Sequence, residues 1–123
     1  NFGHTLGHAL EAAAGYGLPH GSAVSMGMVL ESRLGQRLEI TEEGTDELLA
    51  RTLRRFDLPV RPPQGTDVER VMGFTRTDKK GRGGRPRYVL LARPGEVDRG
   101  RNWSHPVPDG EAESVLRDAL DVT

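Results

Sequence analysis

The sequence predicts a mostly helical domain with at most one small β-hairpin. Apolar residues recur at helical spacing in several segments, and only one short run, Arg87 to Ala92, has the composition of a strand. The chain contains no cysteine, which excludes disulfides and thiolate metal sites. At 123 residues the chain has the length of one domain, 1–123.

Two helices are expected at the start of the chain. The first runs from Phe2 to Ala14, where Leu6, Ala9, Leu10 and Ala13 fall on one helical face. Glycines and a proline then end it. The second helix runs from about Gly21 to Leu34 and is apolar on most sides, which is typical of a buried helix. Gly35 stands where a C-cap would lie.

A third helix is expected from Glu42 to about Phe56, with Thr41 as its N-cap. Acidic residues crowd its start and arginines its end, a polarity that suits the helix dipole. Its apolar residues predict a buried stripe of Leu48, Leu49, Leu53 and Phe56.

The second half of the chain combines two further helices with the strand segment. Asp67 is expected to cap a short helix through Phe74, and Asp109 a final helix containing Val115 and Leu116. Between them lies the Gly- and Arg-rich loop of residues 78–87. The strand from Arg87 to Ala92 is followed by a turn and a weak second strand near Val97.

Charge is distributed unevenly, although the net charge is -1. Residues 75–101 contain nine basic and three acidic side chains. Such a loop suits phosphate or carboxylate ligands, with a solvated surface loop as the alternative. Nucleic acid is not an expected partner, because the chain has no basic helix and only 5% aromatic residues. With no apolar run long enough for a membrane span and no basic leader, we expect a cytoplasmic protein without membrane contact.

Three histidines form the strongest candidate site. His4 and His8 lie four residues apart, on one face of the first predicted helix. His20 begins the next helix after a short turn, so it can lie near them. Neutral imidazole is a common ligand of Zn²⁺, and this pattern predicts a metal site. The competing interpretation is a pair of histidines that lies by coincidence at the surface or is hydrogen-bonded in the core. Glu11 could orient an imidazole or form a surface ion pair.

These residues also carry a family resemblance. The stretch NFGHTLGHALE, followed by GYGLPHGSAVSMGMV and later by DKK, resembles the C-terminal domain of 3-dehydroquinate synthases. The likeness is strong over residues 1–34 and weaker beyond them. It implies that this chain is the helical C-terminal domain of that fold, without the sequence that precedes the domain in the family. The N-terminal NAD-binding domain would then be a missing partner, and we expect a homodimer.

The resemblance assigns roles to individual residues. It implies that His4 and His20 bind Zn²⁺ or Co²⁺, with a third ligand from a Glu upstream of the motif. His8 would contact substrate and assist proton transfer, and Asn1 would bind substrate. A Lys of the DKK loop, Lys79 or Lys80, would bind the anionic end of the substrate. Ser22 replaces the Glu that usually follows His-Gly in the family, which puts the bracing of the site in question.

The implied reaction converts 3-deoxy-arabino-heptulosonate 7-phosphate, an anionic sugar-acid phosphate, to 3-dehydroquinate and phosphate, a step of aromatic amino-acid biosynthesis. NAD⁺ oxidises a hydroxyl transiently and is regenerated. Related sugar-phosphate cyclases of the valiolone or inosose synthase type are the alternative, although the DKK motif favours the first reading. Metal-dependent alcohol and glycerol dehydrogenases are a more distant relation. The 123-residue chain alone is expected to be an inactive helical module.

Overall fold

The computed structural model describes residues 2–15, 17–77, 86–100 and 103–121. Its five helices are α1 (His4–Ala13), α2 (His20–Arg37), α3 (Thr45–Arg55), α4 (Val68–Thr77) and α5 (Asp109–Leu120). Four very short strands accompany them: β1 (Arg87–Tyr88), β2 (Leu91–Arg93), β3 (Glu96–Val97) and β4 (His105–Pro106). The predicted mostly helical class is confirmed.

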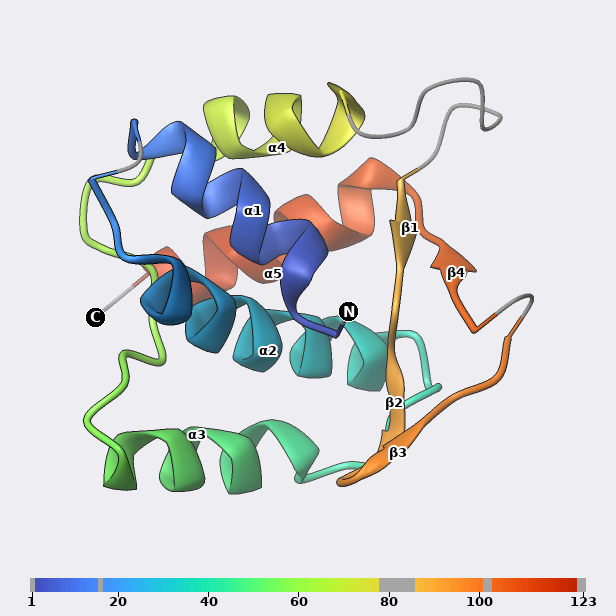
Figure 1. Ribbon diagram of the computed structural model, residues 1–123. Helices are drawn as coiled ribbons and strands as arrows, with labels where there is room; N and C mark the ends of the chain where they lie inside the picture. The colour runs from blue at the N-terminus through green and yellow to red at the C-terminus, as the bar shows by residue number, and fades with distance from the viewer. Residues whose placement is uncertain (1, 16, 78–85, 101–102, 122–123) are drawn as a thin grey trace.

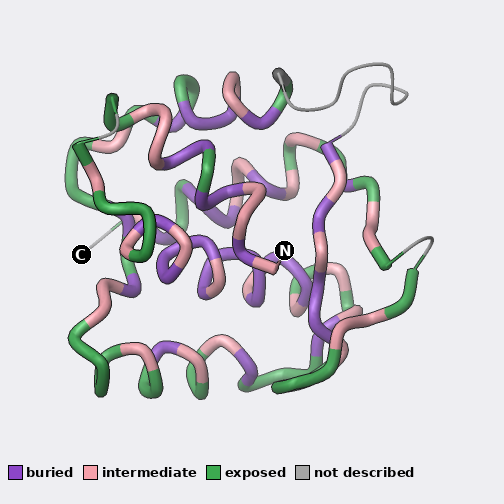
Figure 2. Tube along the Cα trace, in the orientation of Figure 1, coloured by how far each residue is buried: buried purple, intermediate pink, exposed green. Residues whose placement is uncertain are grey.

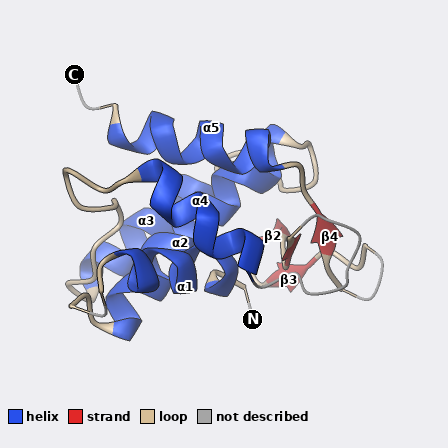
Figure 3. Cartoon of the chain, turned by 90° about the horizontal axis from the view of Figure 1, so that it is seen from above, coloured by secondary structure: helices blue, strands red, loops and turns tan. Residues whose placement is uncertain are grey.

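The central element is α2. It packs against α1 and α5 on one side and against α3 on the other, while α4 lies over α1 (Figure 1). The strands gather at one end of the helices, as the view from above shows (Figure 3). Within the described ranges, no helix is both long and apolar enough to cross a membrane.

The main core lies where α1, α2, α4 and α5 meet (Figure 2). Its largest side chains are almost fully buried: Leu6, Met26, Leu30, Leu34, Met72, Tyr88, Leu90 and Leu116. Two of them, Tyr88 of β1 and Leu90 just after it, come from the strand segment, which explains why so short a segment is apolar. A smaller cluster of Val29, Ala50 and Val60 holds α3 against the opposite face of α2.

One hairpin forms as predicted, between β2 and β3. Gly95 occupies its turn at φ 81°, a left-handed conformation that glycine adopts without steric cost. A second pair joins β1 to β4, with Tyr88 opposite His105. Sequence patterns missed β4 because a two-residue strand containing Pro106 has no alternation to recognise.

The predicted end of the second helix is wrong. Gly35 is not a C-cap but lies inside α2, which continues to Arg37. A Cβ at Gly35 would collide with the side chain of Thr41, so glycine is there for close packing. The chain leaves the helix through Glu39, whose φ of 62° is the left-handed conformation that a C-terminal glycine usually supplies.

The predicted start of the third helix is also wrong. Thr41 does not cap α3, because its hydroxyl donates to the carbonyl oxygen of Leu91, 2.5 Å away. The helix begins at Thr45, after Gly44 at φ 89°. The hydroxyl of Thr41 therefore makes a long-range hydrogen bond to Leu91 in place of the local capping bond. The cap predicted for the fourth helix is confirmed, since an oxygen of Asp67 accepts the amide of Arg70 at 3.2 Å.

The predicted buried stripe of α3 is only partly correct. Leu53 packs in the small cluster, but Leu48 is 40% exposed and Phe56 is 71% exposed. Ala50, which the pattern did not single out, is the residue buried against α2. The short side chain of Ala50 lets α3 lie close to Val29, and this orientation turns the larger apolar residues outward.

Candidate metal centre

The first two helices bring three imidazoles together. His4 and His8 lie one turn apart on α1, and His20 is the first residue of α2. The ring centroids are 5.1 Å apart for His4 and His8, and each lies 5.7 Å from that of His20. One nitrogen from each ring lies within 4.8 Å of the other two. The predicted convergence of the three histidines is confirmed.

Close contact between helix backbones sets this geometry. A Cβ on Gly27 would lie 2.8 Å from the amide nitrogen of Gly7 and 3.0 Å from its Cα. A Cβ on Gly7 would in turn lie 3.1 Å from the carbonyl oxygen of Ala23. The helices α1 and α2 can approach this closely only because these positions lack side chains.

Two of the imidazoles are oriented by acceptor groups. Nδ1 of His20 lies 2.9 Å from Oε1 of Glu11, and Nδ1 of His4 lies 3.2 Å from the carbonyl oxygen of Phe2. If Nδ1–H donates in both contacts, each Nε2 keeps its lone pair for a ligand. Metal-binding histidines ordinarily have such carboxylate or carbonyl partners. Glu11 thus has the orienting contact that the sequence left open.

The donor set fits a borderline-soft divalent cation. Three imidazole nitrogens suit Zn²⁺ or Co²⁺ better than Mg²⁺ or Ca²⁺, which prefer oxygen. His8 and His20 are exposed and His4 is half-buried, so a bound ion would remain open to a further ligand. Among the described residues, no hydrogen bond is made by the imidazole of His8, in contrast to those of His4 and His20.

The remaining predicted site residues have different outcomes. Asn1, Lys79 and Lys80 lie outside the described residues, so their assigned roles stay predictions. Ser22 is half-buried in the first turn of α2. His105 has no counterpart in the family motifs, and a surface position was predicted for it; its side chain is instead only 16% exposed, and its Nε2 lies 3.1 Å from Oδ2 of Asp98.

Sequence reasoning missed Glu31, a fully buried carboxyl group on α2. Its Oε1 accepts the amide of Gly3 and its Oε2 the amide of Leu6, both at 2.8 Å. Burial raises the pKa of Glu31 to about 8, against the lowering effect of these hydrogen bonds. A signal was present in the sequence, since Glu31 is an acidic residue in the middle of a predicted buried helix.

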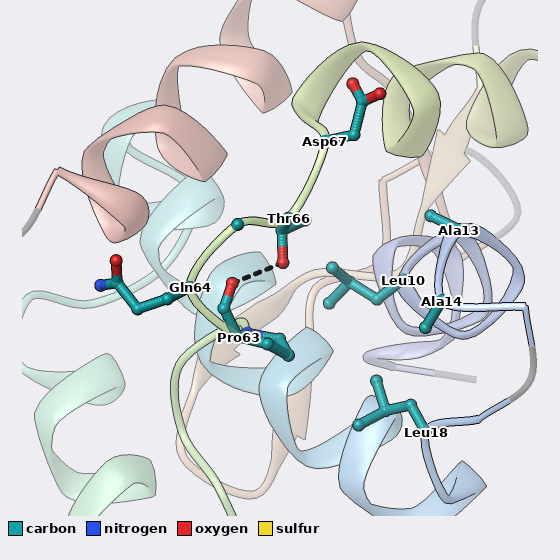
Figure 4. Close-up of a pocket in the computed structure, with 9 residues that line it drawn as sticks. Leu10, Ala13, Ala14, Leu18, Pro63, Gln64, Thr66 and Asp67 are labelled. Atoms are coloured by element: carbon teal, nitrogen blue, oxygen red, sulfur yellow. Dashed lines mark hydrogen bonds between the residues drawn. The ribbon is translucent and has the colours of Figure 1, made fainter.

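A hollow of about 250 Å³ lies beyond the far end of α1 (Figure 4). Leu10, Ala13, Ala14 and Leu18 line one side, and the connection from Pro63 to Asp67 lines the other. None of the three histidines borders it. Asp67 is the one ionisable residue among the described residues of its lining, whereas three imidazoles converge at the start of α1 and α2, so the candidate centre stays with the histidines.

Solved structures identify the fold. The chain is similar to 2-deoxy-scyllo-inosose synthase complexed with carbaglucose-6-phosphate, NAD⁺ and Co²⁺, with a TM-score of 0.81 and 23% identity over 97% of this chain and 33% of the other. It is also similar to 2-epi-5-epi-valiolone synthase from Streptomyces hygroscopicus subsp. jinggangensis with NAD⁺ and Zn²⁺ bound. That TM-score is 0.76 at 24% identity, over 98% and 32% of the two chains. The fold is the one these two synthases share.

Sequence comparison then defines the family. The model described as 3-dehydroquinate synthase C-terminal matches residues 1–81, and the chain belongs to this family. A 3-dehydroquinate synthase of Symbiobacterium thermophilum is 47% identical over 79% of this chain and 27% of the relative. Another, of Xanthomonas oryzae pv. oryzae, is 40% identical over 95% of this chain and 31% of the relative. The chain thus spans less than a third of either relative's length.

Proposed function

We propose that this chain is the metal- and substrate-binding part of a 3-dehydroquinate synthase. The reaction converts 3-deoxy-arabino-heptulosonate 7-phosphate to 3-dehydroquinate and phosphate. The observation that carries the proposal is the convergence of His4, His8 and His20, with one nitrogen from each within 4.8 Å. Membership of the family supports the choice of reaction.

His4 and His20 are the proposed metal ligands, because Nδ1 of each ring has an acceptor partner and Nε2 is left for the ion. The inosose synthase structure contains Co²⁺ and the valiolone synthase structure contains Zn²⁺, which supports either ion here. When bound, such an ion acts as a Lewis acid that stabilises negative charge developing on a substrate oxygen. The remaining ligands would come from substrate and from the rest of the longer protein.

His8 is the proposed proton acceptor. It lies one turn from His4, is exposed, and has no hydrogen-bond partner in the described part of the chain. An imidazole of this kind can take the proton of a substrate hydroxyl group, while the carbon that carries this group would lose hydride to NAD⁺. NAD⁺ bound by the longer protein would supply the oxidant and would be regenerated when the hydride is returned. Oxidation would make the neighbouring C–H acidic, so that its proton could pass to an oxygen of the phosphate group while the C–O bond to phosphate breaks.

The anionic groups of the substrate need cationic or amide partners. Asn1 and either Lys79 or Lys80 are proposed for this role, within a segment that is strongly basic overall. NAD⁺ would be bound mainly by an N-terminal domain of the longer protein. A homodimer is the proposed assembly.

A related cyclase is the second candidate. The two similar solved structures are of synthases named for other products, a deoxy-inosose and a valiolone, and they share the fold at TM-scores of 0.81 and 0.76. Their identity to this chain is 23% and 24%, whereas the curated 3-dehydroquinate synthases reach 47% and 40%. The higher identity favours dehydroquinate formation.

The test uses the full-length protein with three substrates, namely the heptulosonate phosphate, glucose 6-phosphate and sedoheptulose 7-phosphate. We expect phosphate release and dehydroquinate formation with the first alone, without net NADH at the nicotinamide band. Turnover of either sugar phosphate without dehydroquinate would overturn the proposal in favour of the related cyclases. Net NADH production would indicate a dehydrogenase instead.

Two variants separate the proposed roles. His8→Ala should retain its metal and lose about 10²- to 10⁴-fold in kcat, the usual contribution of a general base. His4→Ala should lose the metal itself, which elemental analysis of the purified protein would detect. Metal loss in His8→Ala, with metal retained in His4→Ala, would contradict these assignments.

A further inference from the structure

The first turn of α1 lacks the cap that its own sequence would ordinarily supply. The first amides of any α-helix have no partner within the helix. Here the N-cap is Gly3 at φ 86°, which has no side chain, and the first turn contains no acidic residue. The helix that carries His4 and His8 therefore depends on another element to satisfy its first amides.

Glu31 of α2 supplies that cap. Its two carboxyl oxygens accept hydrogen bonds from the backbone amides of Gly3 and Leu6, each with a nitrogen–oxygen distance of 2.8 Å. These amides flank His4 on both sides along the chain. The side chain is fully buried, so water does not compete for either contact. Hydrogen bonds are stronger in a buried site than in water, so these two contacts hold the helix end in place.

The cap also fixes α1 relative to α2. Gly27, one turn before Glu31, lies in backbone contact with Gly7. His20, the third element of the candidate centre, begins the same helix that carries both residues. Glu31 and Gly27 thus hold the start of α1 at a set position along α2, and that position determines how far His4 lies from His20.

We propose that Glu31 is a positioning residue for the metal centre, which holds the first turn of α1 so that His4 and His20 keep the spacing a cation needs. The inference rests on the proposed function for the identity of the ion. It does not require Glu31 to touch the ion or the substrate. Metal affinity commonly falls about 10- to 100-fold when a residue that orients the ligands is changed.

The test compares Glu31→Gln with the wild type in the full-length protein. The amide keeps the size of the side chain but accepts only one of the two backbone amides. We expect the affinity for Co²⁺, measured by competition with a chelator, to fall about 10- to 100-fold. The visible absorption of bound Co²⁺ should also change, because the ligands are differently arranged. Glu31→Asp should give an intermediate effect and serves if the Gln variant does not fold.

Val115→Ala is the control for loss of stability alone. Val115 is buried on α5, in the main core but not in the candidate centre. The Ala variant should be less stable and yet bind Co²⁺ as the wild type does. The proposal fails if Glu31→Gln keeps the wild-type affinity and spectrum, or if Val115→Ala weakens Co²⁺ binding as much at equal stability.

The outcome is separable from that of the proposed function. A wild-type protein that binds Co²⁺ tightly but forms no dehydroquinate would refute the reaction and leave the role of Glu31 intact. A wild-type protein that binds no Co²⁺ would overturn the role of Glu31 as well.

Discussion

At the scale of single residues, the contact between Glu11 and His20 has the clearest consequence. The carboxylate lies 2.9 Å from Nδ1 of an imidazole that is itself 56% exposed. An exposed ring is free to rotate unless a partner restrains it. Glu11 is only 19% exposed, and its contact with Nδ1 leaves Nε2 of His20 available to a ligand.

Glu11→Gln should therefore weaken metal binding without removing a ligand. We expect the affinity for Zn²⁺ in the full-length protein to fall about 10- to 100-fold, measured by chelator competition. Glu47→Gln, at an exposed carboxylate of α3, is the matched control and should leave the affinity unchanged. Equal affinities in the two variants would show that Glu11 does not orient His20.

The contacts of the metal centre differ in how well the sequence predicts them. The spacing of His4 and His8 on one helix, with His20 after a short turn, was enough to predict that the three rings meet. The sequence left open whether Glu11 orients an imidazole, and its partner His20 could not be predicted because the pairing depends on the path of the turn between the helices. Glu31 was missed although an acidic residue in a predicted buried helix is a signal, because its partners are backbone amides, which a pattern of side chains does not reveal.

At the scale of elements, the crossing of α1 and α2 determines the arrangement of the centre. The two helices touch through Gly7 and Gly27, where any Cβ would press against backbone. Backbone atoms cannot rotate away as the end of a flexible side chain can. The helices must therefore separate if a methyl group is inserted, and the histidines at their ends must separate with them.

Gly27→Ala should accordingly destabilise the protein by about 1 to 3 kcal/mol, the usual cost of overpacking. Gly73→Ala is the matched control on α4, where a Cβ would meet nothing within 4 Å. That change should stabilise the protein by about 0.5 to 1 kcal/mol, because alanine favours a helix interior. Urea unfolding measures both, and a Gly27→Ala variant as stable as Gly73→Ala would contradict the close crossing.

Helix existence was predicted well from periodicity, and helix boundaries less well. Thr41 and Gly35 carried good local signals for a cap, but the two residues pack against each other. The hydroxyl of Thr41 also bonds to Leu91, fifty residues away in the chain. Contacts of this range override the local preference for a cap.

At the scale of the whole molecule, the buried carboxyl of Glu31 links folding to pH. Its pKa is 4.5 in the unfolded chain and about 8 in the folded protein. Because the folded value is the higher one, the folded state favours the protonated form. The stabilisation from this proton is fully present below pH 4.5 and is lost as the pH rises through 8.

The difference in unfolding free energy between the wild type and Glu31→Gln should therefore depend on pH. Between pH 5 and pH 8, about the range that separates the two pKa values, the wild type should lose stability relative to the Gln variant. Urea unfolding at several pH values measures this difference. A difference that stays constant over the range, as we expect for Val115→Ala, would show that Glu31 is not protonated on folding.

The order of residues along the chain has one further consequence for biosynthesis. All three imidazoles lie between positions 4 and 20, whereas Gly27 and Glu31 follow later. A ribosome therefore completes the set of donor nitrogens before it adds the residues that align them. Ten residues, from Gly21 to Leu30, separate His20 from Glu31, so the alignment of the imidazoles must wait for a further stretch of synthesis.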